Sequence, residues 1–211
     1  MISCKLTGGL GNYLFQIAAA STLAYKNNDT SIFDFGPSVG QAHKNINLYT
    51  TNILRKINIG NPNSKYIYSE PKDFSYQNIP YSQDLILEGY FQSSKYLDRE
   101  YILKLYEIDN QTESYINSKS ILPLLKKSVS IHIRRGDYIG RSNHPTQSID
   151  YYNKAMENFP NSNFIIFSDD IEWCKENFKG DKFTFIHEDD YIELYLMSMC
   201  QHNIIANSTF S

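Results

Sequence analysis

The sequence predicts an α/β protein with parallel sheets, and three observations support this. Short apolar runs alternate with stretches long enough for helices, most regularly in the second half of the chain. Turns that carry glycine or aspartate follow several of these runs. The 211 residues suffice for one large domain or two small ones. Because strands that alternate with helices form βα units, we expect the strands to pair in parallel in a doubly wound sheet.

In the first half, a strand, a glycine turn and a helix are expected in succession. Residues 2–6 form the strand, 8–12 the turn and 14–26 the helix, in which apolar residues recur near helical spacing. Further strands are expected over 32–35 and 86–91.

The middle of the chain is harder to interpret. Residues 36–84 are polar, have weak periodicity and predict only irregular connections and short helices. Helices are expected over 96–105 and 107–125, and the second of these is expected to join two domains, 1–120 and 121–211.

The second half predicts four strands separated by helices. The strands are expected at 128–133, 163–167, 182–186 and 202–206, and the helices at 149–158, 170–178 and 191–200. Two of these strands read as continuous apolar runs, which is typical of strands buried on both faces of a parallel sheet.

Composition excludes several classes of protein. A net charge of −3 offers no basic field for nucleic acid. Three widely spaced cysteines form neither a disulfide framework nor a zinc motif, which favours a reducing cytosol. The amino terminus lacks a signal peptide, and no apolar run approaches the roughly eighteen residues that a membrane span needs. We expect a soluble cytoplasmic protein, and peripheral membrane contact stays open.

The run from Val129 to Tyr138 places two arginines, a glycine and an aspartate where a strand ends. Arginine binds phosphate oxygens through a planar fork that stays charged, and ligands of open α/β sheets lie at the carboxyl ends of strands. Strand alternation turns His132 and Arg134 to one side and Arg135 to the other. With Arg141, the two arginines would form a local positive spot. The alternative is a surface turn with a local Arg–Asp ion pair.

His132 and the clusters at residues 8–12 and 169–170 also have alternative interpretations. His132 is more often a hydrogen-bonded core residue than a catalyst. The glycines of 8–12 let backbone N–H groups approach an anionic ligand or form a tight turn, but their spacing is not that of a dinucleotide motif. Asp169 and Asp170 can bind guanine or ribose, hold a metal or cap the next helix. Residues 207–211 offer hydroxyl and backbone donors for an anion.

Five blocks together resemble the α-1,2-fucosyltransferases, glycosyltransferase family 11. In family order they are Gly8-Gly-Leu-Gly-Asn-Tyr-Leu-Phe-Gln16, Leu87-Glu-Gly-Tyr-Phe-Gln-Ser93, His132-Ile-Arg-Arg-Gly-Asp-Tyr138, Phe167-Ser-Asp-Asp170 and Ile205-Ala-Asn-Ser-Thr-Phe-Ser211. The His-x-Arg-Arg-Gly-Asp block is the most specific of them.

The resemblance implies a GT-B-like architecture of two Rossmann-like halves, the first serving the acceptor and the second the donor GDP-β-L-fucose. It implies inverting transfer to the 2-hydroxyl of a terminal galactose, or a similar sugar, on an oligosaccharide or glycolipid, without a metal ion or other cofactor. The alternatives are an inactive GDP-sugar-binding protein or a transferase for a different sugar.

The resemblance also assigns roles to individual residues. Arg134 would stabilise the departing GDP, with Arg135 in support. Related inverting enzymes need not show an obvious general base, and Asp137 and Glu88 are among the candidates for one. The donor would be bound by Gly11, Asn12, His132, Arg134, Arg135, Asp169, Asp170, Ser208, Thr209 and Phe210. Tyr13 and Leu14 depart from the Gln-Met of the family. Members generally continue past the last block, so the C-terminal half is expected to be truncated.

Overall fold

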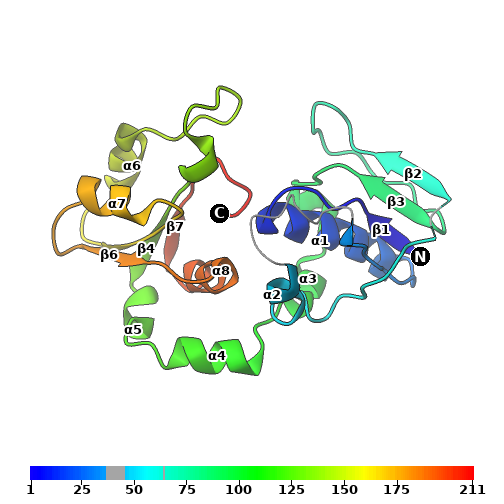
Figure 1. Cartoon of the computed structure of the whole chain (residues 1–211), viewed down its shortest axis with the longest axis horizontal. Coiled ribbons are helices and arrows are strands. Elements are labelled where there is room, and N and C mark those ends of the chain that lie inside the picture. Colours follow the sequence, from blue (N-terminus) through cyan, green and yellow to red (C-terminus); the bar gives the residue numbers. More distant parts are fainter. Residues whose placement is uncertain (37–45, 64) are drawn as a thin grey trace. The chain divides into compact units, whose positions relative to one another are not determined.

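The computed structural model describes residues 1–36, 46–63 and 65–211. The chain divides into two compact units, unit 1 (Met1–Asp109) and unit 2 (Asn110–Ser211), shown in Figure 1. Each unit contains its own all-parallel sheet, which confirms the α/β class. Part of the segment expected to be irregular, residues 37–45 and 64, lies outside the described residues.

The sheet of unit 1 has three strands in the order β1-β3-β2. The strands are β1 (Ile2–Cys4), β2 (Tyr66–Ser69) and β3 (Leu85–Glu88), and β3 pairs in parallel with both neighbours. All three residues of β1 are buried, whereas β2 is a mostly exposed edge strand. The mixed polarity of β2 explains why the sequence did not predict it.

Helix α1 (Leu10–Lys26) packs on β1 and buries the apolar face of unit 1. It starts four residues earlier than expected, because Gly9 takes an extended conformation and serves as the N-cap. Gly11 and Asn12 therefore lie in the first turn of a helix and not in a loop. The fully buried Tyr13 ring packs edge-on against Phe35, at 6.1 Å between centroids. The departure from the family pattern at Tyr13 is thus part of the core.

Short helices complete unit 1. They are α2 (Ile46–Thr50), the 3₁₀ turn η2 (Ser94–Tyr96) and α3 (Arg99–Leu105), which Asp98 caps through the backbone N–H of Tyr101 at 3.0 Å. The strand expected over 32–35 is wrong. Ser31 and Phe33 make only isolated bridges, to Ile2 and Ile59, because the two bridges go to different segments of the chain and form no continuous ladder.

The sheet of unit 2 has four strands in the order β6-β5-β4-β7. They are β4 (Ser128–Ile133), β5 (Asn163–Ser168), β6 (Phe183–Ile186) and β7 (His202–Ile204). Counted within the unit, this is the strand order 3-2-1-4 of the dinucleotide-binding sheet. The order reverses between β4 and β7, and such a switch point is where open α/β sheets bind ligands.

Helices flank this sheet and bury a core between themselves and β4 and β5. They are α4 (Asn110–Asn117), α5 (Leu122–Leu125), α6 (Ile149–Met156), α7 (Ile171–Asn177) and α8 (Asp190–Ser198), with a 3₁₀ turn η3 (Gly136–Tyr138) after β4. The core includes Ile131, Tyr152, Ile166, Cys174 and Phe178. All six residues of β4 are buried, as its apolar sequence predicts.

The single helix expected over 107–125 is wrong, because α4 and α5 are separate helices. Pro123 lies in the first turn of α5, and a proline there lacks the N–H that would continue a helix from Lys119. Helix α4 packs against α8 and so belongs to unit 2, whereas the boundary expected at residue 120 falls between α4 and α5. Among the described residues, no helix has the length and apolar character to cross a membrane.

Candidate active site

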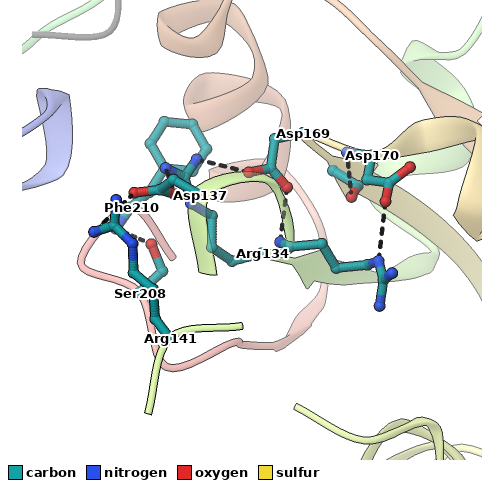
Figure 2. A network of polar contacts seen from close by, with 9 residues as sticks. Arg134, Asp137, Arg141, Asp169, Asp170, Ser208 and Phe210 are labelled. Atoms are coloured by element: carbon teal, nitrogen blue, oxygen red, sulfur yellow. Dashed lines mark hydrogen bonds and ion pairs between the residues drawn. The ribbon is translucent and has the colours of Figure 1, made fainter. Parts of the chain in front are cut away.

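The register of β4 and β5 brings two of the five sequence blocks together in unit 2. Ile133 pairs with Ser168, so both strands end at the same level. The arginines that follow β4 therefore meet the aspartates that follow β5, as Figure 2 shows. This meeting depends on pairing between strands more than thirty residues apart in sequence.

Arg134 is held between two carboxylates. Its Nη2 lies 2.6 Å from Asp137 Oδ1, and its Nη1 lies 3.0 Å from Asp169 Oδ2. The side chain keeps 24% of its surface exposed. Each terminal nitrogen of a guanidinium carries two hydrogens, so a fork used in this way keeps N–H groups for a further anion.

Arg135 is fixed by a carboxylate and an aromatic ring. Its Nε donates to Asp170 Oδ2 at 3.0 Å, and its guanidinium lies 3.8 Å from the centre of the Trp173 ring. The backbone N–H of Arg135 also donates to Asp169 Oδ1 at 2.9 Å. These contacts support the expectation that Arg135 pairs beside Arg134.

The two aspartates after β5 differ in what they hold. Asp170 caps α7 by accepting from the backbone N–H of Trp173 at 3.3 Å, which confirms the expected N-cap. Asp169 instead contacts both arginines, because it accepts from the backbone N–H of Arg135 and forms an ion pair with the side chain of Arg134. The four carboxylate oxygens all contact the arginines or the helix start.

The expected positive spot is wrong. Arg134, Arg135 and Arg141 contact Asp137, Asp169 and Asp170, and the formal charges of these six side chains cancel. Arg141 is the most exposed of the three arginines, at 54%, and its Nη1 lies 3.9 Å from Asp137 Oδ2. The strand register is the reason, because it places an acidic turn beside the basic one.

His132 is buried in β4 with 4% of its surface exposed. Burial, and then the charge of Arg134, lowers its pKa from 6.5 to about 4, so the imidazole is neutral at pH 7. Its ring lies 5.2 Å from that of Phe210. The buried Nδ1 has no hydrogen-bond partner among the described residues. The expected hydrogen-bonded core histidine is therefore buried but unsatisfied at this atom.

The turn after β7 lies at the switch point, next to β4. The backbone N–H of Phe210 donates to Ser208 Oγ at 3.3 Å, and the Phe210 ring contacts His132. Asn207 Nδ2 donates to the Pro145 carbonyl at 2.9 Å and ties the turn to the segment before α6. The structure thus brings Ser208, Thr209 and Phe210 to the same end of the sheet as Arg134.

In unit 1 the other two blocks meet. Gln16 is fully buried; it accepts from the Thr7 backbone N–H at 3.1 Å and donates to the Gly89 carbonyl at 3.0 Å. Gln92 Nε2 donates to Asn12 Oδ1 at 3.3 Å. Gln16 and Gln92 therefore join the start of α1 to the loop after β3, where Gly11 and Asn12 were expected to act.

Glu88, one of the two candidate bases, ends β3. It forms an ion pair with Lys5 and accepts from Ser69 Oγ at 3.3 Å. The hydrogen bond from Lys5 lowers the pKa of Glu88, which makes it a weaker proton acceptor. Asp137, the other candidate, lies against Arg134 in unit 2.

Trp173 is the residue of this network that sequence analysis missed. It lies three positions after the capping Asp170, which turns its ring back toward the strand end and the Arg135 side chain. An aromatic residue in the first turn after a strand-end Asp-Asp pair is the signal that indicates such a contact. In the described part of the chain, no group of three or more His, Cys, Asp or Glu residues is arranged to hold a metal ion.

Comparison with known sequences places these blocks in a family context. The model of a family described as Glycosyl transferase family 11 matches residues 1–211. The whole chain is 30% identical to the O-antigen biosynthesis glycosyltransferase WbnK of Escherichia coli, covering 88% of that protein. It is also 30% identical to an alpha-1,2-colitosyltransferase of Escherichia coli, covering 85%. A galactoside alpha-(1,2)-fucosyltransferase 1 of Plecturocebus brunneus is 28% identical over 39% of this chain and 26% of that protein.

Among solved structures, the fold resembles that of fucosyltransferase NodZ from Bradyrhizobium, with a TM-score of 0.63 at 11% identity, covering 99% of this chain and 90% of that one. The NodZ alpha-1,6-fucosyltransferase co-crystallised with GDP gives a TM-score of 0.63 at 12% identity, covering 99% and 89%. This similarity confirms the GT-B-like fold class.

Proposed function

Because the chain belongs to glycosyltransferase family 11, we propose that it transfers L-fucose from GDP-β-L-fucose to the 2-hydroxyl of a terminal galactose, or a similar sugar. The acceptor would be an oligosaccharide or a glycolipid. The observation that carries the proposal is the arginine–aspartate network at the switch point of unit 2. The NodZ structures that were soaked with GDP-fucose or co-crystallised with GDP support the choice of nucleotide.

In the proposed reaction, the bond between the anomeric carbon and the β-phosphate oxygen breaks, and GDP leaves with the electron pair. The acceptor oxygen attacks from the opposite face and inverts the anomeric centre. Negative charge grows on the phosphate as the bond breaks, and a fixed guanidinium stabilises that charge without reorganising. We assign this role to Arg134, supported by Arg135, with backbone and hydroxyl donors from Ser208, Thr209 and Phe210.

The proton of the acceptor hydroxyl must pass to a base or to water. Asp137 stays a candidate, but its contact with Arg134 at 2.6 Å suits a second role, which is to orient the guanidinium. We propose that Asp169 contacts guanine or ribose through the oxygen lone pairs that its two arginine contacts leave open, since Asp170 also caps α7. Gly11, Asn12 and His132 complete the proposed donor contacts.

A titration that compares GDP with UDP tests the nucleotide assignment. We expect GDP to bind at least tenfold more tightly, because a carboxylate accepts paired N–H donors from guanine and not from uracil. Equal binding of the two nucleotides contradicts the assignment. Release of GDP from GDP-fucose in the presence of lactose, with NMR of the product, then tests transfer and linkage.

A second candidate function keeps the reaction and changes the sugar. The alpha-1,2-colitosyltransferase of Escherichia coli matches the whole chain, and colitose is L-fucose without its 3-hydroxyl. Turnover of GDP-colitose and GDP-fucose at equal concentration separates the two donors. Tight GDP binding without turnover of either would instead favour the inactive GDP-sugar-binding alternative.

We propose that transfer needs no metal ion, because the fixed N–H groups of the Arg134 guanidinium can stabilise the departing phosphate at short range. Addition of EDTA should leave the initial rate within about twofold. A loss of activity that Mg²⁺ or Mn²⁺ restores would contradict this proposal.

A further inference from the structure

Phe74 combines two features that are each unfavourable. Its φ of 55° lies in the left-handed region, which bulky residues rarely adopt and which costs on the order of 1–3 kcal/mol. Its side chain is 63% exposed, so burial does not offset that strain. A strained residue that displays an apolar ring to solvent is a reason to look for a ligand at that ring.

Local hydrogen bonds hold Phe74 in this conformation. Its backbone N–H donates to the Pro71 carbonyl at 2.9 Å. Asp73 Oδ1 accepts from the backbone N–H of Ser75 at 3.1 Å and from its hydroxyl at 2.8 Å. The ring therefore projects from a tight turn in the segment after β2, which Figure 1 shows extending beyond the strands.

A second ring lies beside it on the next loop of the sheet. The rings of Phe74 and Tyr90 are tilted by 53° with centroids 6.2 Å apart. Glu70 fixes the loop of Tyr90, because its carboxylate accepts from the backbone N–H groups of Tyr90 at 2.7 Å and Phe91 at 3.0 Å. Gly89 allows this close contact, since a Cβ there would lie 2.4 Å from Glu70 Cβ.

The two rings lie where a parallel sheet binds ligands. Their loops follow the carboxyl ends of β2 and β3, which are paired neighbours. The loop of Tyr90 continues to Gln92, whose side chain contacts Asn12 at the start of α1. The aromatic pair is thus continuous with the polar cluster that joins two of the sequence blocks.

The chemistry of this surface suits a sugar. A pyranose has a face of C–H groups and a rim of hydroxyls, and the negative face of an aromatic ring attracts polarised C–H groups. Ligand sites of this kind combine aromatic side chains with a few placed polar groups, which Gln92 and Asn12 provide here. A protein partner would require a much larger contact area than two rings offer.

We propose that Phe74 and Tyr90 form an aromatic platform that binds the C–H face of the acceptor galactoside. The choice of a galactoside rests on the proposed function. The platform itself rests on the strained, exposed Phe74 ring, its contact with Tyr90 and the fixed loops that present both.

The test compares Phe74→Ala with Phe74→Trp and a control, Tyr66→Ala. Alanine removes the ring and keeps a β-carbon at the same backbone angle, tryptophan restores an aromatic face, and Tyr66 is a 57%-exposed ring at the opposite end of β2. Lactose binding is followed by saturation-transfer NMR in the presence of GDP, and transfer by the KM for lactose. Circular dichroism and GDP titration monitor the fold and the nucleotide site.

We expect Phe74→Ala to weaken lactose binding and raise its KM about tenfold, with GDP affinity unchanged. Phe74→Trp and Tyr66→Ala should stay within about twofold of the wild type. If Phe74→Ala keeps wild-type lactose binding, the platform is wrong while transfer by the wild type still supports the proposed function. If the wild type binds lactose but transfers no fucose to it, and Phe74→Ala no longer binds lactose, the platform stands and the proposed function fails. Absence of lactose binding to the wild type overturns the platform.

Discussion

Gly136 lies so close to Asp169 that a Cβ atom at Gly136 would be 2.5 Å from the carboxylate Oδ2. Asp169 has little freedom to move, because it also holds the backbone of Arg135 and the side chain of Arg134. The glycine of the His-x-Arg-Arg-Gly-Asp block therefore makes room for the acidic turn after β5.

We predict that Gly136→Ala displaces Asp169 and weakens GDP binding at least tenfold, with a loss of about 1–3 kcal/mol in the free energy of unfolding. Gly180→Ala is the matched control. Gly180 has a φ of 107° and open space around it, so alanine there strains the backbone and leaves the site untouched. Titration calorimetry and urea unfolding give the two quantities, and unchanged GDP affinity in Gly136→Ala would falsify the role of this contact.

Arg134→Lys tests whether the planar guanidinium group is needed, since lysine keeps the positive charge. Lysine keeps the positive charge near Asp137 and Asp169 but cannot bind both carboxylates and a phosphate in one plane. We predict a fall of about 10²–10³ in kcat, the scale seen when one preorganised donor is lost, with stability within about 1 kcal/mol. Arg141→Lys, at a more exposed position in the same cluster, should change kcat less than threefold.

Arg134→Ala is the harsher variant, because it removes both the charge and the planar guanidinium. Its loss removes the guanidinium from two carboxylates, Asp137 and Asp169, whose side chains are about three-quarters buried, so it should also reduce stability by about 1–3 kcal/mol. A folded Arg134→Lys variant with wild-type turnover would contradict the leaving-group role, and this result would not depend on the stability of the alanine variant.

His132 should make the protein less stable in mild acid. Its pKa is about 4 in the folded state and about 6.5 when unfolded, so the unfolded chain takes up the proton first as the pH falls. The contribution is fully present above pH 6.5, declines through the interval and is lost by about pH 4, and it amounts to roughly 3 kcal/mol. Urea unfolding at pH 7 and pH 4.5 measures it.

The difference in unfolding free energy between pH 7 and pH 4.5 should be smaller in His132→Gln, because glutamine does not titrate in this range. His202→Gln, at an exposed position on β7, serves as the control and should keep the wild-type difference. If His132→Gln loses stability between pH 7 and 4.5 as steeply as the wild type does, other groups cause the decline.

Glu188 anchors α4 to the segment before α8. Its carboxylate lies 2.5 Å from Lys119 Nζ and accepts from the Tyr115 hydroxyl at 2.7 Å, and the pKa of Lys119 is raised chiefly by its hydrogen bond to Glu188. Both charged side chains are about three-quarters buried. We predict that Glu188→Gln lowers the unfolding free energy by about 1–2 kcal/mol.

Glu172→Gln provides the comparison for this pair. Glu172 pairs with Lys175 on the surface of α7, and 77% of the Glu172 side chain is exposed. Glu172→Gln should therefore change the unfolding free energy by no more than about 0.5 kcal/mol. Equal effects of the two variants, measured by urea unfolding, would mean that the Glu188 pair contributes no more than a surface pair.

Sequence analysis predicted unit 2 better than unit 1 for a physical reason. The central strands of unit 2, β4 and β5, are buried and read as continuous apolar runs, so β4 has the expected bounds. β2 is an exposed edge strand, and its sequence carries no such pattern. The sequence placed the arginines and aspartates at strand ends, but only the register between β4 and β5 shows that their charges cancel.

The periodicity of the sequence also carries no information about contacts between residues that lie far apart in the chain. An acidic run such as the one beginning at Glu188 is typical of a solvated loop, yet its first residue pairs with Lys119, which lies 69 positions away. Phe74 likewise gave no signal, since its backbone angle and its contact with Tyr90 arise from the turn itself.

The cancelled charge at the end of β4 has a kinetic consequence. A cluster of six side chains with equal numbers of positive and negative charges produces a field that fades within a few ångströms, so it does not draw an anionic nucleotide from a distance. Encounter with the donor should then proceed at the ordinary diffusional rate. The association rate constant should consequently change little as ionic strength rises, since only a long-range field is sensitive to screening by salt.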